Sequence, residues 1–196
     1  MTSGSVLVAV TSRAAVASAL IATAACAPLG ELRPASGMMP GRTYEVGAGA
    51  VRLGPRPYVT ESAAGTGQLW FSANASELWT LSAIGAFDLH SAAGGGALRF
   101  NAARYRTFRG GVEVQAGWAW GAFTLPLAVR LFDETWIYAS PRLGTMSRYP
   151  SFGLPVGLSA RVYDGFALRA EVQTSWEDFD PYQRRVHLAA GAAYQW

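Results

Sequence analysis

Residues 151–176 read SFGLPVGLSARVYDGFALRAEVQTSW. Apolar residues alternate with small or polar ones, and a period of two is typical of a β-strand, whose successive side chains point to opposite faces. Asp164 and Gly165 interrupt the alternation, and an Asp-Gly pair closes tight hairpins because both positions tolerate positive φ. The stretch therefore predicts two long antiparallel strands joined by a two-residue turn.

The same alternation continues through most of the chain. Ten segments show it, at residues 43–53, 67–75, 78–90, 97–107, 111–122, 123–132, 136–144, 151–163, 166–176 and 184–196. Segments of this length fit tilted strands that cross a bilayer, whereas strands in soluble proteins average about 5–6 residues. We expect an all-β fold, a closed antiparallel up-and-down transmembrane barrel of ten strands, or of eight if weaker segments merge.

Composition supports a barrel in a membrane. Hydrophobic residues make up 51% of the chain and charged residues only 15%, against about 25% charged in soluble domains. The alternative is a soluble β-sandwich or lipocalin-like barrel with its apolar faces turned inward. The second faces are rich in Gly, Ala and Ser, and aromatic residues gather near segment ends, both of which favour the membrane barrel.

Charge and cysteine content exclude other classes. All 16 basic residues are Arg, and they are scattered singly rather than clustered, which argues against nucleic-acid binding. The single cysteine, Cys26, excludes an intramolecular disulfide framework and a Cys-based metal site. No cofactor and no metal are expected.

The first 25 residues have the order of a secretory signal, with Arg13 before the apolar run 14–22. The end of this segment, Thr23-Ala24-Ala25-Cys26, resembles a bacterial lipobox, which implies lipidation of Cys26. Ordinary signal-peptidase cleavage and an uncleaved helix are the alternatives. We expect a signal peptide at 1–25, a Pro- and Gly-rich flexible tether at 26–42 and a barrel at 43–196.

The last residues, HLAAGAAYQW at 187–196, resemble the C-terminal signature of bacterial outer-membrane β-barrel proteins. In that family an aromatic residue ends the chain and apolar residues precede it at every second position. Here those positions hold Leu188, Ala190, Ala192, Tyr194 and Trp196. The resemblance implies recognition by the barrel-assembly machinery and a place in the bacterial outer membrane, but it implies no activity.

The resemblance also implies that both ends of the barrel face the periplasm. Counting back from Trp196 then places 177–183, 145–150, a short turn at Gly121, 91–96 and 55–66 outside. The turns at 164–165, 133–135 and 108–110 lie inside.

Charged residues recur on the faces assigned to the lumen. They are Glu45, Arg99, Glu113, Arg130, Arg142, Arg161, Arg169, Glu171 and Arg185. The interior of so small a barrel is barely wider than its side chains, so opposite charges there must pair. We expect a plug of Arg–Glu pairs, and the alternative is a narrow anion-selective pathway.

Two rim features suggest other functions. Asp88 and His90 share a face at the outer end of a strand, where a carboxylate beside an imidazole could serve a small barrel hydrolase. His187 is assigned to the lumen in a structural role. The acidic loop 177–180 could hold a divalent cation that bridges lipopolysaccharide phosphates, although a solvated loop is the simpler interpretation.

The function favoured by these patterns is a non-enzymatic barrel that anchors the envelope or is the membrane subunit of a motility, adhesion or secretion assembly. Its partners would be outer-membrane lipid and lipopolysaccharide, the assembly machinery and other envelope proteins.

Overall fold

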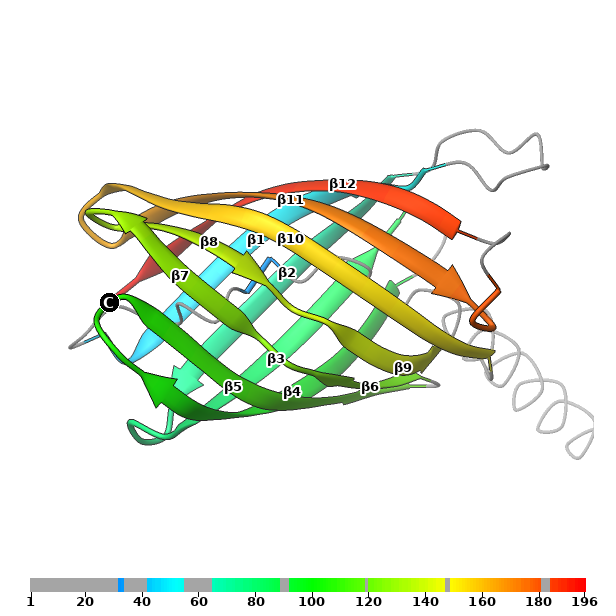
Figure 1. Cartoon of the computed structure of the whole chain (residues 1–196), viewed down its shortest axis with the longest axis horizontal. Coiled ribbons are helices and arrows are strands. Elements are labelled where there is room, and N and C mark those ends of the chain that lie inside the picture. The colour runs from blue at the N-terminus through cyan, green and yellow to red at the C-terminus, as the bar shows by residue number, and fades with distance from the viewer. Residues whose placement is uncertain are drawn as a thin grey trace, which may run out of the picture.

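The computed structural model describes residues 32–33, 42–54, 65–88, 92–118, 120–146, 149–180 and 184–196. These residues form one antiparallel sheet that curls into a barrel with tilted strands (Figure 1). The strands are β1 (Tyr44–Arg52), β2 (Gly65–Asn74), β3 (Trp79–Phe87), β4 (Ala92–Arg104), β5 (Phe108–Gly117), β6 (Trp120–Thr124), β7 (Leu127–Phe132), β8 (Thr135–Ala139), β9 (Arg142–Met146), β10 (Tyr149–Tyr163), β11 (Phe166–Glu177) and β12 (Arg184–Gln195). Within these ranges no helix is long and apolar enough to span a bilayer.

The sheet closes on itself, as the sequence predicts. β12 pairs with β1 in an unbroken register from Glu45 opposite Gln195 to Arg52 opposite Leu188. β11 pairs with both β10 and β12. No strand of the ring is therefore left with an unpaired edge, which a bilayer requires.

The twelve strands make ten spans of the barrel. β6 and β7 are one span interrupted at Pro126, and β8 and β9 are one span interrupted at Pro141. Proline has no N–H to donate to the ladder. Its carbonyl still accepts, since Gly111 N donates to Pro126 O at 3.0 Å and Leu125 N donates to Pro141 O at 2.9 Å. The interruptions are thus local and leave ten antiparallel spans, the larger of the two expected numbers.

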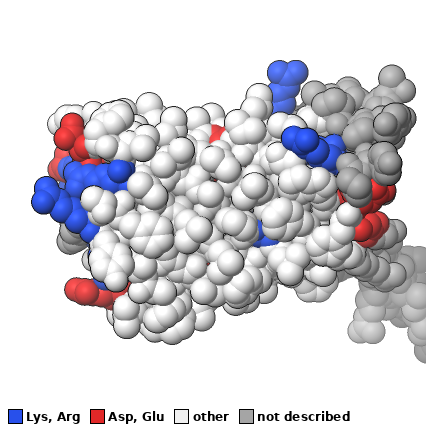
Figure 2. All heavy atoms as spheres, in the orientation of Figure 1, with Lys and Arg blue, Asp and Glu red and all other residues white. Residues whose placement is uncertain are grey.

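Apolar side chains cover the outside of the barrel. Each of the following is more than a third exposed: Val46, Leu69, Leu81, Leu98, Val114, Phe123, Val129, Ile137, Leu143, Val156, Leu158, Leu168, Val172, Val186 and Leu188. Figure 2 shows the middle of the barrel almost free of charge, with Arg, Asp and Glu side chains gathered at its two ends. An uncharged apolar band between charged rims is the surface of a transmembrane barrel and not of a soluble one.

Aromatic side chains flank this band. At the end that carries the C-terminus, Trp196 lies 5.8 Å from Tyr44 and 6.0 Å from Tyr194, ring centre to ring centre. At the opposite end Phe152 and Trp176 lie 5.3 Å apart. The five residues of the C-terminal signature all lie on the outer face of β12 or directly after it.

We call the end of the barrel with Tyr44 and Trp196 the terminal mouth and the other end the distal mouth.

Two connections between strands lie at other residues than the sequence predicts. Residues 92–96, expected in an outer loop, belong to β4, and the turn expected at 108–110 lies at 105–107. The Asp164-Gly165 turn is confirmed, with Gly165 at φ 74°.

The predicted strand 111–122 was wrong because it contains a turn. β5 ends at Gly117, which pairs with Trp120 at the start of β6. Trp118 is exposed on the outside, whereas Trp120 is only 4% exposed and points into the lumen. The turn expected at Gly121 therefore lies earlier in the sequence, between Gly117 and Trp120.

Candidate functional site: the charged lumen

Glu45 forms the first of two charged centres in the lumen. Its carboxylate accepts two hydrogen bonds from Arg169, at 2.9 and 2.6 Å, and one from Trp70 Nε1 at 2.7 Å. Gln195 Nε2 donates a further bond at 2.5 Å. Bidentate guanidinium–carboxylate pairs are among the strongest hydrogen-bonded contacts in proteins. This centre joins β1, β2, β11 and β12 across the seam where the barrel closes.

Glu113 forms the second centre. Arg99 Nε on β4 donates to it at 2.7 Å, and Gln115 Nε2 donates at 2.6 Å. The third partner is Arg33, whose NH2 group donates at 2.6 Å. Glu113 is only 1% exposed. One buried carboxylate therefore faces two guanidinium groups.

Leu32 and Arg33 lie inside the barrel, contrary to the expectation of a flexible tether throughout 26–42. Leu32 is 1% exposed and Arg33 7%. The Leu32 side chain packs on a buried apolar cluster with Val51, Trp70, Ala189 and Ala193. Arg169 donates to the Leu32 carbonyl at 2.7 Å, and Arg99 donates to the Arg33 carbonyl at 2.8 Å. Both carbonyls, the charge of Arg33 and the apolar side chain of Leu32 therefore have partners inside the barrel.

Glycines on the inner face of the barrel make room for aromatic rings and for the Leu32 side chain. A Cβ at Gly47 would lie 2.1 Å from the Trp70 ring, and one at Gly157 would lie 2.6 Å from the Tyr138 ring. A Cβ at Gly49 would lie 2.4 Å from the Leu32 side chain. The small residues of the inner faces are thus required by close approach of rings and of the inserted chain.

The other residues assigned to the lumen are more scattered. Glu171 accepts a hydrogen bond from the Tyr138 hydroxyl at 3.0 Å. Arg142 lies over the Trp120 ring at 5.8 Å, and Arg185 pairs with Glu177 at 3.1 Å near the distal mouth.

Arg130 and Arg161 were expected in the same network and do not belong to it. Arg130 pairs with Glu134 at 3.6 Å and donates to the Asp133 carbonyl, while Arg161 pairs with Asp164 at 2.7 Å. Both lie at the terminal mouth. Period two assigns a residue to a face but does not give its depth along the strand, which depends on where each turn falls.

The lumen holds one Ser–His pair. Ser175 Oγ and His187 Nε2 share a hydrogen bond of 2.8 Å. His187 Nδ1 is buried without a hydrogen-bond partner among the described residues, so no carboxylate orients the ring as a hydrolytic triad needs. His90 lies outside the described residues, although Asp88 is described. No group of three His, Cys, Asp or Glu side chains in the described ranges could hold a metal ion.

Sequence reasoning missed Leu32, Arg33, Trp70, Tyr138, Gln195 and Ser175 as members of the lumen network. The first two lie in a segment without periodicity, and their partners are 66–137 residues away in sequence. Trp70 and Tyr138 carry a polar atom on an apolar ring, so the alternation does not assign them to a face. The only signal in the sequence was that each carboxylate buried in the lumen needs hydrogen-bond donors.

Protection of Leu32 can be measured directly. In the Cys26→Ala background, Leu32→Cys should react slowly with a water-soluble maleimide in folded barrel, because the side chain is buried. Adding Arg33→Asp should expose it, since an aspartate beside Glu113 repels the segment from the lumen. The rate of labelling is followed by mass shift, and a cysteine at exposed Glu77 is the fast-reacting control. Equal rates at positions 32 and 77 would contradict the placement.

Comparison with known proteins gives only distant similarity. No protein-family model matches the chain, and no curated protein matches it. Among solved structures, Ail, the attachment invasion locus protein of Yersinia pestis, is 13% identical over 79% of this chain and 97% of its own, with a TM-score of 0.39. Ail in complex with the heparin analogue sucrose octasulfate gives 13%, the same coverage and a TM-score of 0.40. Neisserial surface protein A is 10% identical over 78% of this chain and 97% of its own, with a TM-score of 0.38.

Proposed function

We propose that the chain is a non-enzymatic bacterial outer-membrane barrel that serves as an anchor or membrane subunit of an envelope assembly. The uncharged outer band and its flanking aromatic side chains support the membrane placement. The barrel-assembly machinery and lipopolysaccharide are its proposed partners during and after insertion. An adhesion, secretion or motility assembly would use it as a rigid, lipid-embedded support.

The occupied lumen is the observation that carries this proposal. Glu45 and Glu113 are each held by several donors, and Leu32 and Arg33 fill the space between them. A barrel whose interior holds its own ion pairs together with Leu32 and Arg33 gains rigidity and has less room for solute. The anion-channel alternative needs a row of Arg side chains along the lumen, whereas Arg130 and Arg161 lie at the terminal mouth and Arg99 and Arg169 are paired with carboxylates.

A conductance measurement tests the proposal. The wild-type barrel, first shown to be folded by its heat-modifiable migration on a gel, should give no ion current in a planar bilayer. The Arg33→Asp variant, in which the segment is displaced, should raise the current if the segment is part of the seal. Steady anion-selective current through wild-type protein would overturn the anchor proposal in favour of the channel.

Lipidation of Cys26 is part of the proposal and has its own test. Leu32 is held in the lumen six residues after Cys26, and six extended residues reach at most about 22 Å. An acyl chain on Cys26 would have to meet the membrane within that reach. Wild-type protein should incorporate radioactive palmitate and Cys26→Ala should not, while both remain in the membrane because strand burial holds them there. An unlabelled wild-type protein would remove the lipoprotein proposal and leave the barrel.

A further inference from the structure

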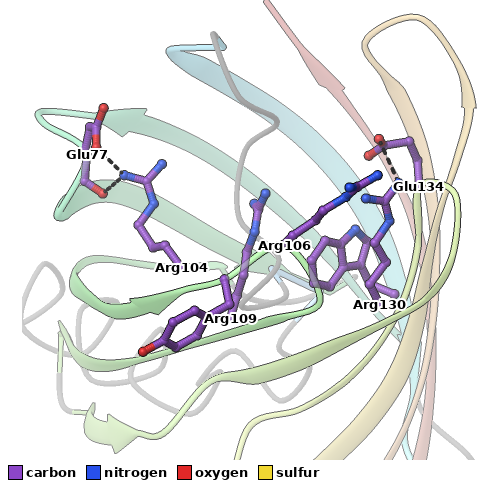
Figure 3. A pocket seen from close by; sticks show the side chains of 8 residues that line it. Glu77, Arg104, Arg106, Arg109, Arg130 and Glu134 are labelled. Carbon is purple, nitrogen blue, oxygen red and sulfur yellow. Dashed lines mark hydrogen bonds and ion pairs between the residues drawn. The ribbon is translucent and has the colours of Figure 1, made fainter.

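An open hollow of about 470 Å³ lies at the terminal mouth. Figure 3 shows the side chains that line it, which come from three turns and the strands beside them. They are Glu77, Arg104, Tyr105, Arg106, Arg109, Arg130, Glu134 and Trp136. Its volume is within the range of about 300–1,000 Å³ typical of small-molecule sites. The network around Glu45 and Glu113 does not include these residues.

The lining is strongly basic. It contains four guanidinium groups and two carboxylates, an excess of two positive charges. Arg104 is the last residue of β4, Arg106 lies in the turn at 105–107, and Arg109 follows on β5. Arg109 stacks over the Trp136 ring at 4.9 Å, which holds its guanidinium plane at the wall of the hollow.

The two carboxylates hold their partners weakly. Glu77 is 91% exposed in its side chain and approaches Arg104 at 3.3 Å, while Glu134 approaches Arg130 at 3.6 Å. Exposed pairs of this kind contribute about 0–1 kcal/mol. An incoming anion could therefore replace either carboxylate at small cost.

We propose that this hollow binds a phosphate group. A phosphate monoester carries about 1.5 to 2 negative charges near neutral pH and a diphosphate carries more, so either can balance the excess of the lining, whereas a single carboxylate would balance half of it. The planar fork of arginine also fits phosphate oxygens in a bidentate arrangement. The exposed aromatic Tyr105 stands at the edge of the hollow, where a larger group attached to the phosphate could pack.

Two sources could supply such a group: free phosphate compounds in the water at the mouth, or a lipid in the adjacent leaflet whose headgroup is a phosphate monoester, such as phosphatidic acid. The inference is independent of the anchor role, since the hollow and the charged lumen involve different residues.

Calorimetric titration of the folded full chain with inorganic pyrophosphate at low salt tests the free-phosphate source. Arg106→Gln and Arg109→Gln should each weaken binding by about tenfold or more, because each removes a charged hydrogen-bond donor. Arg106 lies in the turn at 105–107, so its replacement leaves the strands intact and keeps the test valid even if Arg109→Gln folds poorly. Heat-modifiable migration confirms folding of each variant.

Arg161→Gln is the matched control. It removes one positive charge from the same mouth, but Arg161 and Arg42 both bind Asp164, each at 2.7 Å. The hydrogen bond and charge of Arg42, together with those of Arg161, hold the pKa of the Asp164 carboxyl below its ordinary value. Arg161 does not line the hollow, so its loss removes no hydrogen-bond donor from the site and should change binding by less than about twofold.

A second arm tests the lipid source. Native mass spectrometry counts phosphatidic acid retained by wild-type and variant barrels from vesicles that also contain phosphatidylcholine. Retention of phosphatidic acid that falls in Arg106→Gln, without pyrophosphate binding, supports the headgroup source. The proposal is overturned if neither anion binds, or if Arg161→Gln weakens binding as much as Arg106→Gln does.

Discussion

Replacing Glu113 with leucine is expected to lower the free energy of unfolding by about 3–5 kcal/mol, because the change leaves the Arg33 and Arg99 guanidinium groups buried without their carboxylate. Both groups lie within 2.7 Å of that carboxylate, at 8% or less side-chain exposure. The effect is large because the charges that remain are desolvated, and not because the pair itself contributes so much. Urea unfolding of the barrel in vesicles, followed by the heat-modifiable band, measures it.

Two further variants separate this cause from general damage. Glu77→Leu makes the same chemical change at an exposed ion pair and should cost about 0.2–1 kcal/mol. Replacing Arg33, Arg99 and Glu113 together with leucine should recover much of the lost stability, since no uncompensated charge remains. If the triple variant is no more stable than Glu113→Leu, the burial of unpaired charge is not the reason for the loss.

Val172→Arg is expected to destabilise the barrel by about 2–4 kcal/mol in a bilayer, because position 172 lies on the outer face near mid-strand. Val172 is 48% exposed and pairs with Val156 at the middle of β10. An arginine there must enter hydrocarbon or distort the bilayer around it. The same unfolding measurement in vesicles gives the free-energy change.

Val162→Arg is the matched control for depth. Val162 is 55% exposed on the same outer face, but it lies one residue from the end of β10 at the terminal mouth. An arginine at the interface costs only about 0–1 kcal/mol. Equal, small effects at positions 162 and 172 would mean that water and not lipid surrounds the barrel, and the membrane placement would be wrong.

The fold was predictable because strand alternation is local and repeats over most of the chain. In β10 up to Ala160, and in β11 and β12, the predicted faces agree with the structure, since the Asp164-Gly165 turn marks where one strand ends. Prediction failed after Gly117, because the alternation of the sequence continues unbroken through Trp118 and Trp120 and does not mark the turn. Gly117 and Trp120 pair with each other across the turn and therefore lie on the same, inner face. Simple alternation would put an odd-numbered and an even-numbered residue on opposite faces, so the prediction assigned Trp120 to the outside.

The candidate site was predictable only in part. Alternation places Glu45, Arg99, Glu113 and Arg169 on the inner face, but it does not say which carboxylate binds which guanidinium. Those pairings depend on how strands far apart in sequence meet across the lumen: Arg169 and Glu45 are separated by 124 residues. The positions of Leu32 and Arg33 could not be predicted for another reason. Two residues are too few to show a period, and their place in the barrel depends entirely on the residues they contact.

The inserted dipeptide imposes an order of events on assembly. A ring of paired strands can be entered only through its ends, and Arg33 would have to lose its water before meeting Glu113 if it entered after closure. Export delivers residues 32–33 before any strand and β12 last of all. We therefore expect residues 32–33 to be in place when β12 joins β1 and β11, so that the last strand completes the wall around them.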